Sequence, residues 1–201
     1  MSKNFRKVFS TFKENYSPIP LEFFKKDAYR TLISTILSSR TKDETTLKAS
    51  KKLFKVAPDI KKLSKLNQVE ISNSIYPVGF YKTKAKHLQK LAKIIIEKYK
   101  GEIPNEKSKL MSLPGVGIKT ANLTLNRAFG IPAIAVDIHV HRISNMLGWV
   151  NTKTPEQTEI ELVKIIPKKY WSDTNKLFVS IGRQFTTRKR LEEFLKKEKL
   201  V

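Results

Sequence analysis

Helical periodicity is the feature that most limits the fold of this chain. Apolar residues recur every three or four positions in two long segments, whereas no segment alternates apolar and polar residues as a half-buried strand does. The two apolar faces consist of Ala28, Leu32, Ile33, Ile36 and Leu37, and of Leu88, Leu91, Ala92, Ile95 and Tyr99. The sequence therefore predicts an all-α fold.

Shorter helices are predicted where turn residues divide the first half of the chain. We expect them over residues 45–56 and 68–75, with turns at Pro58-Asp59 and at residues 77–79. Gly101 follows two lysines and is predicted to end the longer helix before it. These boundaries give a succession of helices joined by short turns.

Caps also mark the helices of the second half. Residues 154–157 (TPEQ) have the pattern of a capping box with proline at the first helical position, so we expect a helix from there to about Ile166. Ser172-Asp173 is predicted to begin another helix. The apolar run Ile131–Val136 has no partner strand, and we interpret it as a buried connector.

The chain carries far more positive than negative charge. Forty Lys and Arg against eighteen Asp and Glu give a formal net charge of +22 among 201 residues. This charge attracts polyanions, of which nucleic acid is the commonest. Genome bias or growth at high temperature also gives a lysine-rich, isoleucine-rich composition, without any nucleic acid partner. Charge therefore narrows the choice of partner without identifying an activity.

The sequence lacks the residues and segments that several kinds of cofactor site and membrane segment require. There is no cysteine, which excludes disulfides, thiolate zinc sites and cysteine-ligated iron–sulfur clusters. His139 and His141 lie two positions apart and do not share a helical face, so we expect no metal site. No apolar run near the hairpin is long enough to span a membrane, and residues 1–16 lack the apolar core of a signal peptide. We expect a cytoplasmic location with no membrane association.

The segment 112–122 (SLPGVGIKTAN) has the pattern of a helix end, a tight turn and a new helix. Gly115 and Gly117 permit positive φ and let the backbone approach a ligand closely. The amides of Gly117, Ile118 and Lys119 then lie at a helix N-terminus, where unpaired N–H groups and the helix dipole favour an anion. In so basic a chain we expect a DNA phosphate there, held without reading the base sequence.

Four segments together resemble the endonuclease III family of DNA glycosylases. The hairpin (LPGVGIKTA, residues 113–121) resembles the family's helix–hairpin–helix, and residues 135–142 (AVDIHVHR) resemble its V-D-x-H-x-x-R segment. Residues 37–43 (LSSRTKD) and 79–85 (GFYKTKA) continue the similarity, which covers about residues 28–183. The resemblance implies a base-excision-repair DNA glycosylase with AP lyase activity, acting in the nucleoid as a monomer on double-stranded DNA that contains damaged bases or abasic sites.

The resemblance also implies a two-lobed helix–hairpin–helix fold. A central lobe of residues 21–132 would hold the hairpin, and a second lobe would combine residues 1–20 with residues 133–201. The active site would lie in the groove between them. The hairpin residues expected to contact DNA are Leu113, Gly115, Gly117, Ile118 and Thr120.

Lys119 and Asp137 are the predicted catalytic pair. They lie eighteen positions apart, which is the family's spacing for its nucleophilic lysine and its aspartate. Most lysines in a chain with this many are solvated surface groups. Lys119, however, falls beside helix N-terminal amides, where the dipole disfavours a positive charge and favours the neutral, nucleophilic amine. Asp137 has a structural alternative as the N-cap of the following helix, a role compatible with catalysis.

Arg40 and Phe80 are the predicted residues for holding flipped DNA. In the family, a glutamine at the position of Arg40 helps to fill the gap left by the flipped base, and an aliphatic wedge is common at the position of Phe80. A phosphate contact is the alternative for Arg40, and core packing beside Tyr81 is the alternative for Phe80. Arg40 departs from the family's glutamine. This difference leaves open which base the enzyme prefers opposite the damaged one.

Two residues of the predicted Asp137 helix are expected to face the DNA backbone. These are His139 and Arg142, and the alternative for His139 is a buried, hydrogen-bonded histidine. Trp149 and Trp171 are interpreted as core or interlobe packing, without a role in stacking on bases.

Most close members of the family carry four cysteines near the C-terminus that hold a [4Fe–4S] cluster. Gly182-Arg183 matches the motif before the cluster, but Thr186 stands where the first ligand falls. We therefore expect no cluster and no other cofactor, with Phe185 and Leu191 filling its place by packing. The charged tail that follows is expected to form a last helix that is solvated on most faces.

The resemblance favours oxidised pyrimidines as the damaged bases, with abasic sites as another substrate. Two alternatives remain: a glycosylase for 8-oxoguanine or for mismatched thymine or uracil, and a non-catalytic helix–hairpin–helix DNA-binding protein. Lys119 favours the bifunctional enzyme, since binding alone requires no such lysine and mismatch-specific relatives often lack it.

Overall fold

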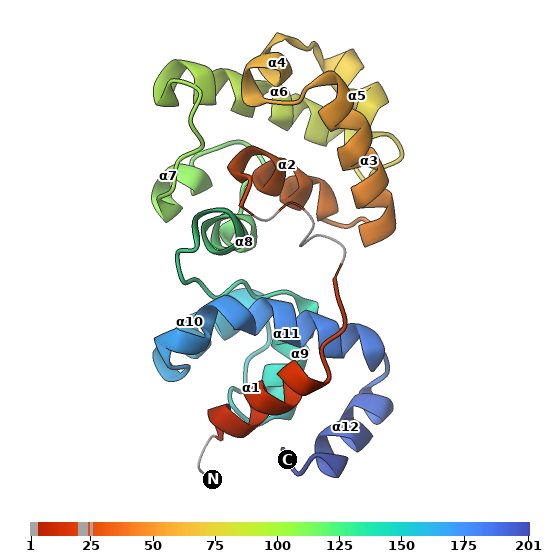
Figure 1. Ribbon diagram of the computed structural model, residues 1–201, viewed down its shortest axis with the longest axis vertical. Helices are drawn as coiled ribbons and strands as arrows, with labels where there is room; N and C mark the ends of the chain where they lie inside the picture. The colour runs from red at the N-terminus through yellow and green to blue at the C-terminus, as the bar shows by residue number, and fades with distance from the viewer. Residues whose placement is uncertain (1–3, 20–23, 25) are drawn as a thin grey trace. The chain divides into compact units, whose positions relative to one another are not determined.

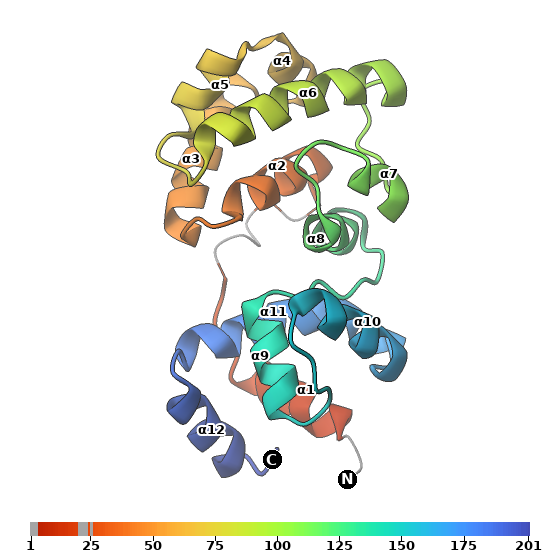
Figure 2. The same cartoon turned by 180° about the vertical axis from the view of Figure 1, so that it is seen from behind.

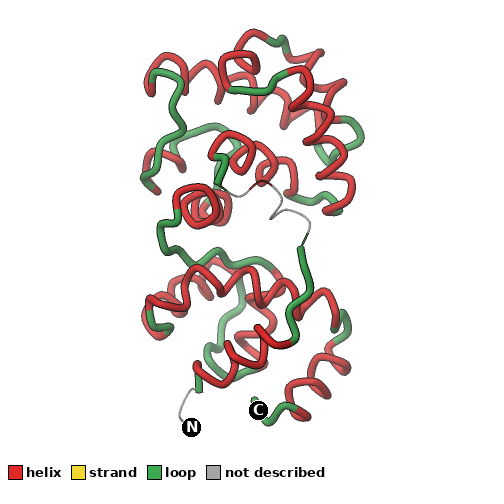
Figure 3. The backbone as a smooth tube through the Cα atoms, in the orientation of Figure 1, coloured by secondary structure: helices red, strands yellow, loops and turns green. Residues whose placement is uncertain are grey.

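The computed structural model describes residues 4–19, 24 and 26–201. Throughout the described residues the regular elements are helices and no strand occurs (Figures 1 and 3), so the predicted all-α fold is confirmed. The chain divides into two compact units: the central unit, residues 20–131, and the terminal unit, residues 1–19 with 132–201. The lobe boundary expected between residues 20 and 21 lies outside the described residues.

The central unit is a layered set of helices. They are α2 (Ala28–Ser38), α3 (Asp43–Val56), α4 (Ile60–Lys65), α5 (Gln68–Ile75), α6 (Tyr81–Tyr99), α7 (Lys107–Met111) and α8 (Ile118–Phe129). The long helix α6 packs against α4 and α5, while α2 packs against α3 and α8 (Figures 1 and 2). Leu32 and Ile33 of α2 and Leu88 and Leu91 of α6 are completely buried. The two apolar faces of the sequence thus form the core of this unit.

Local signals in the sequence set the ends of these helices. Helix α5 begins and ends where it was predicted, and its N-cap Asn67 forms a capping box with Glu70. Helix α3 begins two residues earlier than expected, at Asp43. Helix α6 stops at Tyr99 because the next residue, Lys100, adopts a left-handed conformation just before Gly101.

The terminal unit combines the N-terminal helix with the last third of the chain. Its helices are α1 (Phe5–Glu14), α9 (Ile138–Met146), α10 (Pro155–Ile165), the 3-10 turn η2 (Lys168–Tyr170), α11 (Trp171–Gln184) and α12 (Arg188–Lys197). Helix α11 packs against both α1 and α9. Aromatic rings fill the centre: Phe9 stacks on Tyr170 at 4.3 Å between ring centroids, and Phe12 meets Phe178 edge-on at 5.1 Å.

Both tryptophans contribute to packing in this unit, as expected. Trp149 belongs to its core, 4% exposed. Trp171 is partly buried against the same core and donates its ring N–H to the Ile166 carbonyl at 2.8 Å. Neither ring is presented to solvent as a stacking platform.

The predicted buried connector at residues 131–136 and the predicted capping box at residues 154–157 are both formed in part. Residues 133–136 form a buried connector without regular structure, but Ile131 is 37% exposed and Pro132 is exposed as well. Helix α10 begins at Pro155, where the Thr154 hydroxyl accepts from the Gln157 amide at 3.3 Å. The Gln157 side chain bonds back to the Lys153 amide, one residue before the partner that a capping box uses.

None of the described helices combines the length and apolar character needed to cross a membrane.

Candidate active site

The hairpin predicted at residues 112–122 is formed by α7, a glycine turn and α8. Leu113 and Val116 are buried, and the Val116 amide donates to the Leu113 carbonyl at 3.1 Å, which closes the turn. Gly115 has φ +80°, and a Cβ there would lie 3.0 Å from Nδ1 of His87 on α6. Glycine is required at this position both for its backbone conformation and for the close approach of α6.

The hairpin residues expected to contact DNA differ in how they are exposed. Gly115 and Gly117 are exposed, and Ile118 and Thr120 are partly exposed. Leu113 is 2% exposed, so its side chain anchors the turn in the core and only its backbone is available to a ligand. The contact of these five residues with DNA stays a prediction, which for Leu113 concerns the backbone.

Lys119 is the second residue of α8, and its side chain is exposed. Gly117 occupies the N-cap position in an extended conformation and has no side chain with which to cap the helix. The first turn of α8 also contains no acidic residue. The Lys119 amine therefore extends from the positive end of a helix dipole that no side-chain carboxylate of that turn offsets.

Asp137 is the N-cap of α9, as its structural alternative predicted. Its Oδ1 atom accepts hydrogen bonds from the amides of His139 at 3.0 Å and Val140 at 2.9 Å. One carboxylate oxygen is thus used by the cap, and those bonds fix the orientation of the group. The side chain is half-buried. Since Lys119 belongs to the central unit and Asp137 to the terminal unit, their joint role in catalysis stays a prediction.

Arg40 and Phe80 lie together at one edge of the central unit. Both have left-handed backbones, with φ of 50° and 57° respectively. The Arg40 guanidinium lies over the Phe80 ring at 5.4 Å, and the ring is 61% exposed. The alternative of core packing for Phe80 is therefore wrong: Tyr81 pairs with Tyr76 instead, at 5.3 Å between ring centroids.

Arg142 does not match the expectation of a residue that faces DNA. Its guanidinium donates to the carbonyls of Gly182 at 3.1 Å, Phe185 at 3.2 Å and Thr186 at 2.6 Å. These oxygens lie at the C-terminal end of α11, where carbonyl groups lack partners within the helix. The structure therefore assigns Arg142 to capping α11. His139 packs against Gly182, where any Cβ would collide with the imidazole ring.

The C-terminal segment has an apolar core at the positions where the family resemblance would place cysteine ligands. Phe185 stacks on Phe194 of α12 at 4.4 Å between ring centroids, and Leu191 is completely buried. Leu191, Phe194 and Leu195 form the buried face of α12, and its charged residues lie outside that face. The packing expected of Phe185 and Leu191 is confirmed. In the described part of the chain no three His, Asp or Glu side chains gather as a metal site would require.

One residue that sequence reasoning missed is Lys84. It is 7% exposed and lies in the first turn of α6, on the same face as Leu88 and Leu91. A lysine at a core position of a helical stripe was the signal that could have identified it.

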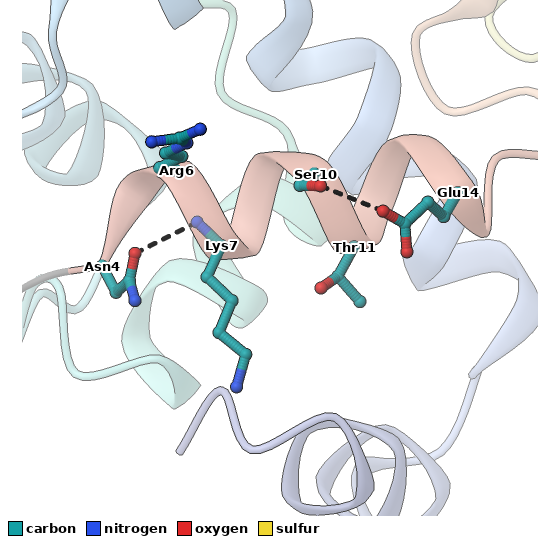
Figure 4. Close-up of a pocket in the computed structure, with 6 residues that line it drawn as sticks. All are labelled: Asn4, Arg6, Lys7, Ser10, Thr11 and Glu14. Atoms are coloured by element: carbon teal, nitrogen blue, oxygen red, sulfur yellow. Dashed lines mark hydrogen bonds between the residues drawn. The ribbon is translucent and has the colours of Figure 1, made fainter.

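One surface hollow, of about 440 Å³, is lined along α1 by residues that include Asn4, Lys7 and Glu14 (Figure 4). Its lining contains none of the residues predicted to act on DNA.

Comparison with known proteins identifies the class to which this fold and hairpin belong. Residues 33–168 match the family described as "HhH-GPD superfamily base excision DNA repair protein". The chain is 45% identical over 172 residues to endonuclease III of Thermotoga maritima, which covers 86% of this chain and 81% of that protein. It is 40% identical to endonuclease III-like protein 1 of Mus musculus, covering 78% of this chain but 53% of that longer protein.

A solved structure agrees with these matches. The structure described as a non-covalent endonuclease III–DNA complex superposes with a TM-score of 0.84 at 34% identity, covering 94% of this chain and 89% of that one. The chain belongs to the HhH-GPD superfamily of base excision DNA repair proteins. Within that superfamily it is a homologue of endonuclease III, and thus a bifunctional DNA glycosylase and AP lyase.

Proposed function

We propose that this enzyme removes oxidised pyrimidines from double-stranded DNA and nicks the strand at the resulting abasic site, with Lys119 as the nucleophile. The observation that carries the proposal is the place of Lys119: an exposed amine in the first turn of α8, directly after the glycine turn of the hairpin. The relative at 45% identity is itself an endonuclease III. A non-catalytic binding module is thereby set aside, because the chain is a glycosylase of this family.

DNA is the partner that the charge and the hairpin support. The net charge of +22 favours association with the phosphate backbone. The N-terminal amides of α8 offer a site for one phosphate, and they position the duplex without reading its bases. The damaged nucleotide must leave the stack, since C1′ is not accessible within a duplex. Arg40 and Phe80, which are exposed and stacked on each other, suit the space that it vacates. The enzyme acts as a monomer, within the nucleoid.

The chemistry proceeds through covalent catalysis. The lone pair of the Lys119 amine forms a bond to C1′ while the C1′–N bond breaks, and the base leaves with those electrons and gains a proton. The lysine nitrogen loses a proton, and its lone pair then forms the C1′=N bond of a protonated Schiff base while the C1′–O4′ bond breaks and O4′ gains a proton. Removal of a C2′ proton then expels the 3′ phosphate and nicks the strand, and water releases the lysine. Asp137, held by its cap bonds, stabilises positive charge on the sugar and accepts a proton from the amine.

Borohydride reduction tests the covalent step. A duplex with one abasic site, incubated with the wild-type protein and borohydride, should give a stable protein–DNA adduct, and Lys119→Gln should give none. Lys109→Gln is the matched control, since Lys109 is an exposed lysine of the same hairpin. Absence of an adduct with the wild-type protein would sink the lyase mechanism.

A panel of duplexes tests the substrate. Thymine glycol should be released faster than 8-oxoguanine, mismatched thymine or uracil. Preferential release of any of the other three would assign the enzyme to the alternative branch.

The enzyme works without an iron–sulfur cluster. The chain has no cysteine, and apolar packing around Leu191 and the Phe185–Phe194 pair holds the C-terminal segment in place. Purified active protein should contain no stoichiometric iron or acid-labile sulfide. Either one at stoichiometric level would contradict this part of the proposal.

A further inference from the structure

Lys84 forms a buried hydrogen-bonded link between two loops of the central unit. Its ammonium group donates to the Leu37 carbonyl at 2.8 Å, to the Ser39 carbonyl at 2.6 Å and to the Thr41 hydroxyl at 3.3 Å. An ammonium group has three donors, and all three have acceptors here. A lysine is seldom buried without a carboxylate partner, so this arrangement calls for a specific reason.

Thr41 extends the link to the second loop. Its hydroxyl accepts from the Gly79 amide at 3.1 Å and from Lys84, and it donates to the Ser39 carbonyl at 3.2 Å. One donor and two acceptors are the full capacity of a hydroxyl group. The loop after α2 and the turn before α6 are therefore joined through a saturated set of hydrogen bonds.

The two loops also press against each other directly. A Cβ at Gly79 would lie 2.5 Å from the Arg40 carbonyl oxygen, so no other residue fits between the backbones. Arg40 and Phe80 both adopt left-handed conformations, which are unfavourable for residues other than glycine. The surrounding structure must maintain these conformations at two positions that are neighbours in space. The hydrogen bonds through Lys84 and Thr41 join the two loops at these positions.

We propose that Lys84 is a positioning residue: it holds Arg40 and Phe80 as one preformed, outward-facing pair that enters the DNA stack together. This inference rests on the proposed function, since it assumes that the pair occupies the space of a flipped nucleotide. The benefit is preorganisation, because side chains already in place lose less conformational freedom when DNA binds. The guanidinium and the aromatic ring are two flat groups, each of which is suited to contact with neighbouring bases.

Two substitutions break the link at different points. Lys84→Met keeps a long side chain but removes the ammonium donor of the Leu37 carbonyl and one of the two donors of the Ser39 carbonyl. Thr41→Val keeps the shape of the side chain but leaves the Gly79 amide without its acceptor. Lys90→Met removes an exposed lysine from the same helix and controls for charge. Leu88→Ala damages the core of the same helix and controls for loss of stability.

The assay uses a duplex with a tetrahydrofuran abasic analogue, which cannot be cleaved, and 2-aminopurine opposite it. Lys84→Met and Thr41→Val should each weaken binding of this duplex about tenfold or more and reduce the 2-aminopurine signal. Binding of an undamaged duplex should change less than about twofold. Lys90→Met should behave as wild type, and Leu88→Ala should lower stability without this selective loss.

A mutant cycle separates positioning from general structural damage. In an Arg40→Ala/Phe80→Ala background, Lys84→Met should weaken abasic-analogue binding by less than about twofold, since the pair on which it acts is gone. An undiminished tenfold loss there overturns the proposal, as does a selective loss in Leu88→Ala. Hydrogen exchange of the Gly79 amide in the free protein should accelerate in both link variants, and unchanged exchange contradicts the link itself.

Failure of this inference is distinguishable from failure of the proposed function. If the wild-type protein forms the borohydride adduct but Lys84→Met binds the abasic analogue normally, only the positioning role is wrong. If the wild-type protein neither forms the adduct nor prefers the abasic analogue, both the proposed function and the inference are overturned.

Discussion

Substitution of Asp137 separates its role as a helix cap from its role in catalysis. The cap uses one oxygen, Oδ1, which accepts from the amides of His139 and Val140 at 3.0 and 2.9 Å. An asparagine keeps an oxygen of the same geometry but removes the negative charge. An alanine removes both. The two substitutions therefore predict different changes in stability and similar changes in activity.

The expected magnitudes follow from this geometry. Asp137→Ala leaves two amides at the start of α9 without an acceptor, so it should lower the free energy of unfolding by about 1 kcal/mol, within the range of about 0.5–2 kcal/mol for lost N-caps. For a chain of this size that is a fall in Tm of about 2–4 °C. Asp137→Asn should change stability by a few tenths of a kcal/mol at most. Both should lower the single-turnover rate of base release by about 100-fold or more, the effect of removing one preorganised electrostatic group.

Urea denaturation and single-turnover excision of a thymine glycol duplex measure the two effects on the same preparations. Wild-type excision by Asp137→Asn would show that the carboxylate serves only as a cap. Unchanged stability of Asp137→Ala would contradict the cap geometry from which the argument starts.

Two further predictions concern the half-buried Arg142 and the buried Lys84. Arg142→Met should lower the free energy of unfolding by about 2–3 kcal/mol, because carbonyls at the end of α11 lose a charged donor. Urea denaturation checks it, and a change near zero would show that the α11 cap contributes nothing. Burial lowers the pKa of Lys84 to about 8. Because the unfolded chain holds that proton up to about pH 10.4, the stability of wild type relative to Lys84→Met should rise with pH from about 8 to 10. Denaturation of both proteins across that pH range measures the difference between their free energies of unfolding, since their other groups titrate alike. A difference that falls as the pH rises would contradict the prediction.

Helix positions were predictable from the sequence because they depend on local signals. The buried stripe of α6, the bounds of α5 and the cap at Asp137 each follow from residues a few positions apart. Such signals act within one or two helical turns, so no knowledge of the tertiary fold was needed. The hairpin was predictable for the same reason.

Contacts between distant segments were not predictable in this way. Arg142 was expected to face DNA, yet its guanidinium reaches carbonyls about forty positions further along the chain. The helical stripe marks Lys84 as a core position, but its acceptors lie more than forty positions before it and no local signal identifies them. Whether a cation faces solvent or caps a distant backbone depends on which segments the tertiary fold brings together. Sequence spacing alone does not identify that distant backbone.

The identity of the trapped lysine tests the central claim most directly. The adduct formed by wild-type protein, abasic duplex and borohydride can be digested, and peptide mass spectrometry then locates the modified amine. The reduced sugar remnant should lie on Lys119, the exposed lysine in the first turn of α8. A remnant on any other lysine, or on the N-terminal amine, would contradict the assignment of the nucleophile.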